Sequence, residues 1–520
     1  MFKTTLTKHK WAIFFCAIST LGALCYGYDQ IYYTGLQGMR PFINLYGTTR
    51  DSTGKIALTT SFLSLTASII YVGELCGALL AAPINDYFGR KGVFFCASIF
   101  IIAGAIVQIA DNGNEGLICF GRILIGLGIG QFTVTCVLYI GEVAPQDIRG
   151  PATMMFQFMQ SCSQLVGSAI TQGTEGISST ASFRIPMGLL GFLPLCMLMG
   201  LPFLPESPVW LVGKNKIQEA AASLRKIHRG EKDYDPALDI EALSLAVENE
   251  RVEASQSTWI SLVKDPIERR KVLYACGSMV AQQINGIQFF YSYGVVFAES
   301  IGMAEPFTIS LITNVLQVIS VGVSVLLGNK VPRRENLLIT SLIMFIALIV
   351  VGGLGIPETM TTAYSTTIVV FSYAVIVAFN FGLGPLAYTV AGEAAAGRNR
   401  SKIMSCAFVS FFFTVWAMVF TSPYLYYSAN LGPMLGFVYA GTTCITLAYV
   451  WFCVGETTGR STLEVELFFQ DKVPVKQWAT HVFPADEIPR EEKGNSEVVP
   501  QRKDDIKEVA GGSSKEVEKV

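Results

Sequence analysis

The sequence predicts an all-helical membrane protein whose transmembrane helices form two halves of six. The first observation is composition, because 51% of the 520 residues are hydrophobic and only 15% are charged. Soluble domains have about a quarter charged residues. The second observation is a regular series of apolar runs, and the third is a set of motifs that recurs roughly 250 residues later. Together they favour one large membrane-embedded body over a row of soluble domains.

Twelve apolar runs are long enough to cross a bilayer, which takes about 20 helical residues. The first run follows a basic N-terminus, 1–10, and lacks a signal-peptide cleavage pattern, so we expect it to be a transmembrane helix. Six runs form an N-terminal half, 11–204, and six form a C-terminal half, 270–454. The expected spans are 11–32, 57–81, 92–110, 117–140, 151–171, 185–204, 271–297, 307–328, 337–355, 365–390, 403–425 and 433–454.

Two segments lie outside the spans. The polar segment 205–269 contains GKNKIQEAAASLRKIHRG, a pattern that favours short amphipathic helices in a cytosolic linker. The segment 455–520 becomes rich in Lys, Glu, Ser and Pro, which predicts a cytosolic tail that is largely disordered. Basic residues gather in alternate short loops, and the positive-inside rule therefore predicts that both termini lie in the cytosol.

Three motifs of the first half return in the second. Glu142 to Arg149 and Glu393 to Arg400 share an E-x6-R spacing, and the D-x-x-G-R-K motif of 86–91 returns as N-x-x-P-R-R at 329–334. PESP at 205–208 is echoed by GETT at 455–458. Such a repeat predicts two similar halves around a central substrate site, as in carriers whose halves rock against each other.

Composition also excludes several functions. A net charge of −2 does not suggest a nucleic-acid partner. The 12 cysteines lie mostly within apolar runs and include no C-x-x-C pair, so we expect neither a disulfide scaffold nor a metal site. No nucleotide-binding loop of the G-x4-G-K-[ST] kind is present. We therefore expect no enzyme activity and no cofactor.

The motifs identify the resemblance. From about residue 10 to 470 the chain resembles the sugar porters of the major facilitator superfamily, fungal ones in particular. The markers are GYD (27–29), NDYFGRKG (85–92), GRILIGLGIG (121–130), YIGEVAPQDIRG (139–150), RIP (184–186), PESPVWL (205–211), QQINGI (282–287) and ETTGRSTLE (456–464). The later half is similar to fungal α-glucoside permeases, whereas Arg122 is typical of hexose and pentose porters. The resemblance implies the major facilitator fold.

Charges inside the spans are few. Only two carboxylates, Asp29 and Glu74, lie well within apolar runs, and Arg122 is the clear cation there; all three histidines fall outside. A charged side chain in the membrane is expensive and by default indicates function. We expect Asp29 to pair with Arg122, which favours the ionised carboxylate, and to take up a proton when the pair separates. The resemblance implies the same proton-coupling role, Glu74 being a second candidate. A static ion pair, such as a facilitator would keep, is the alternative.

A sugar needs partners that both donate and accept hydrogen bonds, together with aromatic faces. Buried amides also tie helices together, so each amide has a structural alternative. By resemblance, the expected substrate-binding residues are Gln157, Gln164, Gln282, Gln283, Gln288, Gln317, Tyr388 and Tyr291.

The chain departs from the family pattern at several positions. Gln288 replaces the usual Asn, Tyr388 the usual Trp, and Phe412 and Val415 the usual Trp and Asn of the eleventh span. We therefore expect a specificity that differs from plain glucose. Pro332 and Gly455 are further departures, and they affect the expected gating contacts.

Charged cytosolic motifs predict a latch that holds the outward-facing state closed on the inside. We expect salt bridges across the two halves. The residues are Asp86, Arg90, Glu142, Arg149 and Glu206 in the first half and Glu393, Arg398, Arg400 and Glu456 in the second.

The sequence thus predicts a multi-pass carrier of the plasma membrane that imports a mono- or disaccharide with a proton and works as a monomer. Its expected partners are the sugar, the proton and the lipid bilayer. A facilitative carrier of a sugar, polyol or sugar acid, and a transporter-like sugar sensor, are the alternatives.

Overall fold

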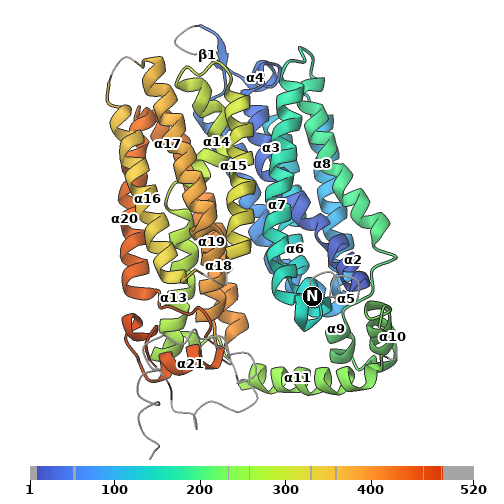
Figure 1. Ribbon diagram of the computed structural model, residues 1–520. Coiled ribbons are helices and arrows are strands. Elements are labelled where there is room, and N and C mark those ends of the chain that lie inside the picture. Colours follow the sequence, from blue (N-terminus) through green and yellow to red (C-terminus); the bar gives the residue numbers. More distant parts are fainter. Residues whose placement is uncertain are drawn as a thin grey trace, which may run out of the picture.

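The protein is a bundle of long, roughly parallel and antiparallel helices in two groups (Figure 1). The structure, a computed structural model, describes residues 9–483 apart from 51–53, 232–233, 257, 328–330, 358–359, 398, 461 and 482. Short helices lie across one end of the bundle, which we call the linker side. The opposite end, called the far side, has a small two-stranded sheet in which β1 (Thr49–Arg50) pairs antiparallel with β2 (Ile56–Ala57).

The first half is formed by the chain up to Gly200. Its longest helix bends at Gly89, whose φ of 76° interrupts the helical backbone between two spans. A left-handed backbone of this kind is readily adopted only by glycine. The helices are α2 (Lys10–Ser19), α3 (Leu21–Gly38), α4 (Arg40–Tyr46), α5 (Thr60–Ala110), α6 (Glu115–Val143), α7 (Gln146–Glu175) and α8 (Ala181–Gly200).

The second half begins at Pro266. Its first span is broken at Gly286, where φ is 80° and the ring of Tyr439 leaves no space for a Cβ. The helices are α13 (Pro266–Gln283), α14 (Ile287–Ser300), α15 (Pro306–Leu327), α16 (Arg333–Leu354), α17 (Thr362–Phe381), α18 (Leu383–Ala394), α19 (Arg400–Pro423) and α20 (Leu435–Cys453), with short turns η1 (Tyr424–Ser428) and η2 (Gly432–Met434) before α20.

Nine helical stretches in the described part of the chain are long and apolar enough to cross a membrane. One of them is α5, whose 51 residues exceed twice the length that one pass requires. The polar α7 and the broken α13–α14 fall outside the nine, yet Figure 1 shows them running beside the other helices. We infer that α5 makes two passes and that these segments supply the rest of a twelve-pass bundle.

Between the halves the chain forms helices on the linker side (Figure 1). They are α9 (Pro208–Gly213), α10 (Ile217–Ile227), α11 (Pro236–Gln256) and α12 (Ser261–Lys264). Leu211 and Val212 of α9 and Ala220 of α10 form a small separate core. This core explains the amphipathic pattern of the segment, because the apolar faces of α9 and α10 are buried in it.

The tail departs from expectation. Residues 462–470 form α21 (Thr462–Gln470), a 3-10 turn η3 (Val475–Gln477) follows, and Trp478 stacks on Phe468 at 4.8 Å between ring centroids. A Cβ at Gly455 would lie 2.2 Å from the Trp478 ring, so the departure to glycine makes room for it. The prediction of a disordered tail is therefore wrong up to Phe483, which is also buried; residues 484–520 lie outside the described residues.

The two halves contact each other mainly through three helix pairs: α3 with α14, α5 with α19, and α7 with α15. Tyr293 donates to the backbone oxygen of Val419 at 3.0 Å and of Leu63, across the halves, at 3.4 Å. Gln172 donates to Thr308 at 2.9 Å near the far side. Arg40 and Glu299 add an exposed ion pair there, which contributes little in water.

Candidate substrate and proton sites

A buried ion pair joins α3 to α6. Arg122 donates from Nη1 to Oδ1 of Asp29 at 2.9 Å, and the two side chains are 4% and 2% exposed. Arg122 also donates to the backbone oxygen of Thr66 at 3.3 Å and lies over the ring of Tyr33, 4.2 Å from its centroid. The guanidinium therefore has an anionic, a polar and an aromatic neighbour, which together replace water around a desolvated charge.

The local sequence explains why Asp29 lies so deep. A Cβ at Gly27 would lie 2.1 Å from the backbone oxygen of Gln160, so glycine allows α3 to pack directly against α7. Because α3 and α7 approach so closely here, the two residues that follow Gly27, namely Tyr28 and Asp29, are buried inside the first half. The predicted pairing of Asp29 with Arg122 is present.

Glu74 is equally buried but makes no hydrogen bond to that pair. Glu74 is 1% exposed, and neither of its carboxylate oxygens has a hydrogen-bond partner within the described residues. A Cβ at Gly130 of α6 would lie 2.0 Å from the backbone oxygen of Glu74, which shows how tightly α5 and α6 pack. A buried polar group without a partner is costly, so Glu74 is a site where a proton or a ligand would relieve a penalty.

A chain of amides crosses from one half to the other. Gln164 of α7 donates from Nε2 to Oε1 of Gln30 at 2.8 Å, and Gln317 of α15 donates to Oε1 of Gln164. Gln160 also donates to Gln30, at 3.3 Å. The predicted residues Gln164 and Gln317 are thus brought together at the interface between the halves.

A second amide group lies around the break between α13 and α14. Gln288 donates to Oε1 of Gln283 at 2.9 Å, Gln283 donates to Gln282 at 3.3 Å, and Gln282 donates to the backbone oxygen of Gly384 at 2.6 Å. All three glutamines are buried. They form a continuous row of donors and acceptors, which suits a ligand rich in hydroxyl groups.

The remaining predicted residues are more scattered. Tyr291 accepts a hydrogen bond from Nδ2 of Asn380 at 2.7 Å. Tyr388 packs against the ring of Phe411, with centroids 5.6 Å apart, and is only partly buried. Gln157 is also partly buried. Phe412 and Val415, which stand where the resemblance implies Trp and Asn, are both 1% exposed and belong to the apolar core.

Sequence reasoning missed Gln30, Gln160 and Asn380. Gln30 directly follows Asp29, so its position beside a functional residue was a usable signal. Asn380 lies in the apolar run of the tenth span, where an isolated amide is unusual. Its partner Tyr291 is distant in sequence, and no spacing rule could have connected the two.

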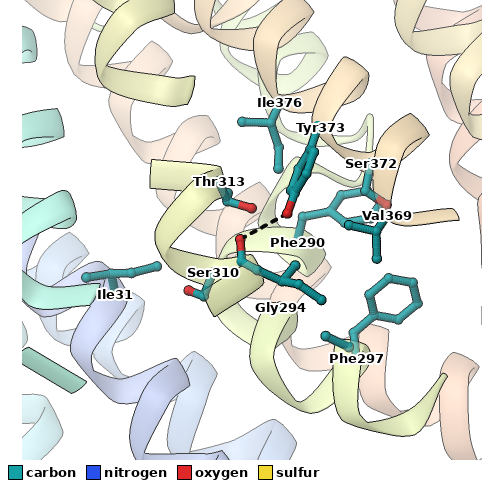
Figure 2. A pocket seen from close by; sticks show the side chains of 12 residues that line it. Ile31, Phe290, Gly294, Phe297, Ser310, Thr313, Val369, Ser372, Tyr373 and Ile376 are labelled. Atoms are coloured by element: carbon teal, nitrogen blue, oxygen red, sulfur yellow. Dashed lines mark hydrogen bonds between the residues drawn. The ribbon is translucent and has the colours of Figure 1, made fainter. Parts of the chain in front are cut away.

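A separate small cavity of about 30 Å³ lies between α14, α15 and α17, with Ile31 of α3 at one edge. Figure 2 shows its mostly apolar lining around Phe290 and Phe297, and the hydroxyl of Tyr373, which donates to the backbone oxygen of Ile309 at 3.5 Å. None of the predicted glutamines lines it. The cavity is therefore not formed by the amide groups, although Ile31 at its edge directly follows Gln30.

The charged motifs on the linker side pair within each half. In the first half Arg90 donates to Glu142 from Nε at 2.8 Å, and Glu206 accepts from the backbone N–H groups of Arg90 and Lys91 at 3.0 and 3.2 Å. Burial raises the pKa of Glu206, and the hydrogen bonds from Ser207, Lys91 and Arg90 oppose that rise.

The second half repeats this arrangement. Arg333 forms an ion pair with Glu393, and Glu456 accepts from the backbone N–H groups of Arg333 and Arg334 at 3.2 and 3.1 Å. Thr457 adds a hydrogen bond to Glu393 at 2.6 Å. Arg333 was absent from the predicted latch, although the repeat aligns it with Arg90.

Among the described residues, the charged motifs form no salt bridge across the halves in this structure. The latch is expected in the outward-facing state and stays a prediction. Glu142 and Glu393 each pair with an arginine of their own half, whereas Glu206 and Glu456 accept backbone N–H groups. Asp86 and Arg400 are exposed. The side chain of Arg149 and the whole of Arg398 lie outside the described residues.

Comparison with known proteins decides the family. Residues 15–469 match the model of the family described as "Sugar (and other) transporter". The chain belongs to this sugar transporter family. The family is one of transporters and not of enzymes, as the absence of catalytic motifs predicted.

Individual relatives are distant in sequence but match over most of their length. Hexose transporter 2 of Kluyveromyces lactis is 27% identical over 88% of this chain and 82% of its own. The low-affinity glucose transporter HXT3 of Saccharomyces cerevisiae shows the same identity and coverage. The high glucose sensor RGT2 of the same yeast is 29% identical, over 86% of this chain and 59% of its own.

Solved structures confirm the fold. The xylose transporter XylE from E. coli, in a partially occluded inward open conformation, superposes with a TM-score of 0.72 at 18% identity, covering 87% of this chain and all of XylE. A second XylE structure, described as a major facilitator superfamily proton:xylose symporter, superposes with a TM-score of 0.70. The predicted major facilitator fold is confirmed.

Proposed function

We propose that this protein imports a sugar across the plasma membrane together with a proton. The observation that carries the proposal is the position of two consecutive residues of α3. Asp29 pairs with Arg122, while Gln30 accepts from Gln164, which in turn accepts from Gln317 of the other half. One turn of one helix thus connects the proton site to the amides that would hold the sugar.

The mechanism follows from this connection. A sugar that binds between Gln164 and Gln317 must break or replace the hydrogen bond between them, which loosens the contact between the halves. The same rearrangement moves Gln30 and the adjacent Asp29. When Asp29 separates from Arg122, the desolvated carboxylate favours its neutral form and binds a proton. Glu74, buried without a partner in the described residues, is a second acceptor for that proton.

The state of the structure supports release on the linker side. The cross-half hydrogen bonds, such as Gln172 to Thr308, lie from the middle of α7 and α15 toward the far side. On the linker side the described charged motifs pair within each half. We place the cytosol on the linker side, with both termini, and the carrier works as a monomer.

The relatives support a sugar as cargo, since they are named hexose and glucose transporters and XylE is named a proton:xylose symporter.

The test uses cells that lack their own sugar carriers. Uptake of labelled hexoses, pentoses, disaccharides and galacturonate is followed at acidic and neutral pH, with and without a protonophore. We expect one sugar to accumulate at acidic pH and the protonophore to abolish this accumulation. Asp29→Asn should remove accumulation by tenfold or more while the protein still reaches the cell surface, because an amide cannot release a proton.

Glu115→Gln is the matched control, because Glu115 is an exposed carboxylate at the start of α6. It should transport as the unaltered protein does. A sugar that merely equilibrates, at a rate independent of pH, would make the protein a facilitator and the Asp29–Arg122 pair structural. No flux of any sugar despite surface expression would favour a sensor, a function for which the similarity to RGT2 is the specific support.

A further inference from the structure

Two of the three histidines of the chain meet one carboxylate where the N-terminal segment touches the linker. His9 precedes α2, and His228 and Glu231 follow α10. Nδ1 of His9 lies 3.2 Å from Oε1 of Glu231, and Nδ1 of His228 lies 3.0 Å from the same oxygen. The three potential ligand atoms all lie within 4.8 Å of one another.

These distances fit a small metal ion. In a tetrahedral zinc site with bonds of about 2.0 to 2.2 Å, neighbouring ligand atoms are about 3.3 to 3.6 Å apart. Two of the three separations in the cluster are within about 0.5 Å of that range before any ion is bound. The third requires only a side-chain adjustment, and the residues are partly to fully buried (His9 is 4% exposed).

The surroundings hold the ligands in place. The turn from His228 to Glu231 is closed by a backbone hydrogen bond of 2.9 Å, which directs both side chains to one side. The ring of His228 stacks on Tyr234, with centroids 4.2 Å apart and planes 12° apart. Arg229, the residue after His228, also contacts the N-terminal segment. Its guanidinium lies 5.0 Å from the ring centroid of Trp11 in α2.

We propose that His9, His228 and Glu231 bind one divalent transition-metal ion, with zinc as the best match, and thereby fasten the N-terminal segment to the linker. Imidazole nitrogen with one carboxylate suits zinc, whereas calcium and magnesium prefer oxygen ligands only. Three protein ligands leave a fourth position for water, so the ion is exchangeable. The sequence predicted no metal site because His9 lies more than 200 positions before His228 and Glu231.

The chemistry requires both Nδ1 atoms to be unprotonated, with the ring proton of each histidine on Nε2. Metal binding therefore competes with protons and weakens in acid. The positive charge of Arg229 disfavours binding of a cation nearby. The guanidinium of Arg229 lies over the indole ring of Trp11, and a cation–π interaction there partly compensates its charge.

The experiment uses the full-length protein, purified in detergent without a polyhistidine tag and stripped of metal. Cobalt(II) is added as the probe, because tetrahedral cobalt absorbs visible light, and zinc is then added as competitor. We expect one equivalent of cobalt to bind and zinc to displace it. His9→Gln, His228→Gln and Glu231→Gln should each weaken cobalt binding by tenfold or more.

His481→Gln is the matched control, since His481 is the third histidine and packs against Phe468 instead. It should bind cobalt as the unaltered protein does. Glu231→His restores a third ligand and should recover the binding that Glu231→Gln loses, which separates ligation from misfolding. The proposal fails if no stoichiometric cobalt band forms, if the band survives all three ligand variants and therefore comes from cysteines, or if His481→Gln loses it equally.

Discussion

The linker-side clusters of the two halves contain the same ion pair on different backbones. In the first half, Gly89 precedes Arg90 with a φ of 76°. In the second half, Pro332 precedes Arg333 with a φ of −57°. Yet Glu206 and Glu456 each accept two backbone N–H groups at the turn, at 3.0 to 3.2 Å.

The difference shows which part of the motif is required. A carboxylate at the start of a helix satisfies free N–H groups and interacts favourably with the helix dipole. Both halves keep that anchor. The glycine is needed only in the first half, where a Cβ at Gly89 would lie 2.6 Å from Oε2 of Glu206. The second half reaches the same contact with proline, which sets φ without a left-handed backbone.

The largest expected effect comes from removing the arginines of the two pairs. Arg90→Ala should reduce sugar uptake per surface protein by tenfold or more. Arg333→Ala should reduce it by a smaller factor. The side chains of Arg90 and Glu142 are 10% and 11% exposed, whereas those of Arg333 and Glu393 are 15% and 25% exposed. Loss of one partner of a buried pair costs about 3 to 5 kcal/mol, and residual exposure reduces that cost.

Arg225→Ala is the control for both, because Arg225 is an exposed cation on α10, and it should leave uptake unchanged. Equal losses for Arg90→Ala and Arg333→Ala would mean that burial does not distinguish the halves. Uptake that survives both changes would show that neither pair takes part in the transport cycle.

An intermediate effect is expected from exchanging the turn residues. Gly89→Ala should lower the melting temperature in detergent. Gly89 has φ 76° and ψ −177°, a conformation nearly restricted to glycine that costs another residue about 1 to 3 kcal/mol, and the new Cβ displaces Glu206. Pro332→Ala keeps an allowed backbone and should cost under about 1 kcal/mol. A thermal-shift assay on the two purified variants measures the difference. A melting temperature that falls as far for Pro332→Ala would contradict the different roles of the two turns.

The smallest expected effect concerns the charge of Glu206. Burial raises the pKa of this carboxyl above its usual 4.5. The protonated form therefore adds stability below pH 4.5, and this contribution is lost as the pH rises through the raised pKa. The melting temperature of the unaltered protein, relative to Glu206→Gln, should thus decrease from pH 4.5 toward neutral pH. The thermal shift of Glu241→Gln, an exposed carboxylate of α11, should show no such trend, and a relative increase for Glu206 would refute the stated direction.

The sequence predicted much of the site because intramembrane charges are scarce. With Arg122 as the one clear cation in a span, Asp29 had a single probable partner, and the structure places the two 2.9 Å apart. The amides were a harder case, because glutamines are numerous and each can bind ligand or helix. Gln164 and Gln317 were predicted separately, but their mutual contact and the position of Gln30 depend on how α7 meets α15.

The latch predicted for the outward-facing state stays a prediction, and its partners could not be read from the sequence for a related reason. The repeat gives each half its own acids and cations, so sequence alone allows pairing within or across the halves. The structure shows pairing within each half, and Arg333, which was not among the predicted latch residues, contacts Glu393. The tail was mispredicted because two aromatic residues, Trp478 and Phe483, suffice to fold it onto Phe468, and a polar composition conceals such sparse anchors.

The sequence by itself determined the apolar spans, their grouping into two related halves, the few charges inside them and the family. These features are local or additive, since a run of about 20 apolar residues partitions into a bilayer whatever its neighbours are. Only the tertiary structure decided which cations Glu142 and Glu393 contact, where the amides cross between the halves, and that His9 meets His228. Such contacts join positions up to hundreds of residues apart, and their free energy depends on distances of a few ångströms that only the packing of the helices sets.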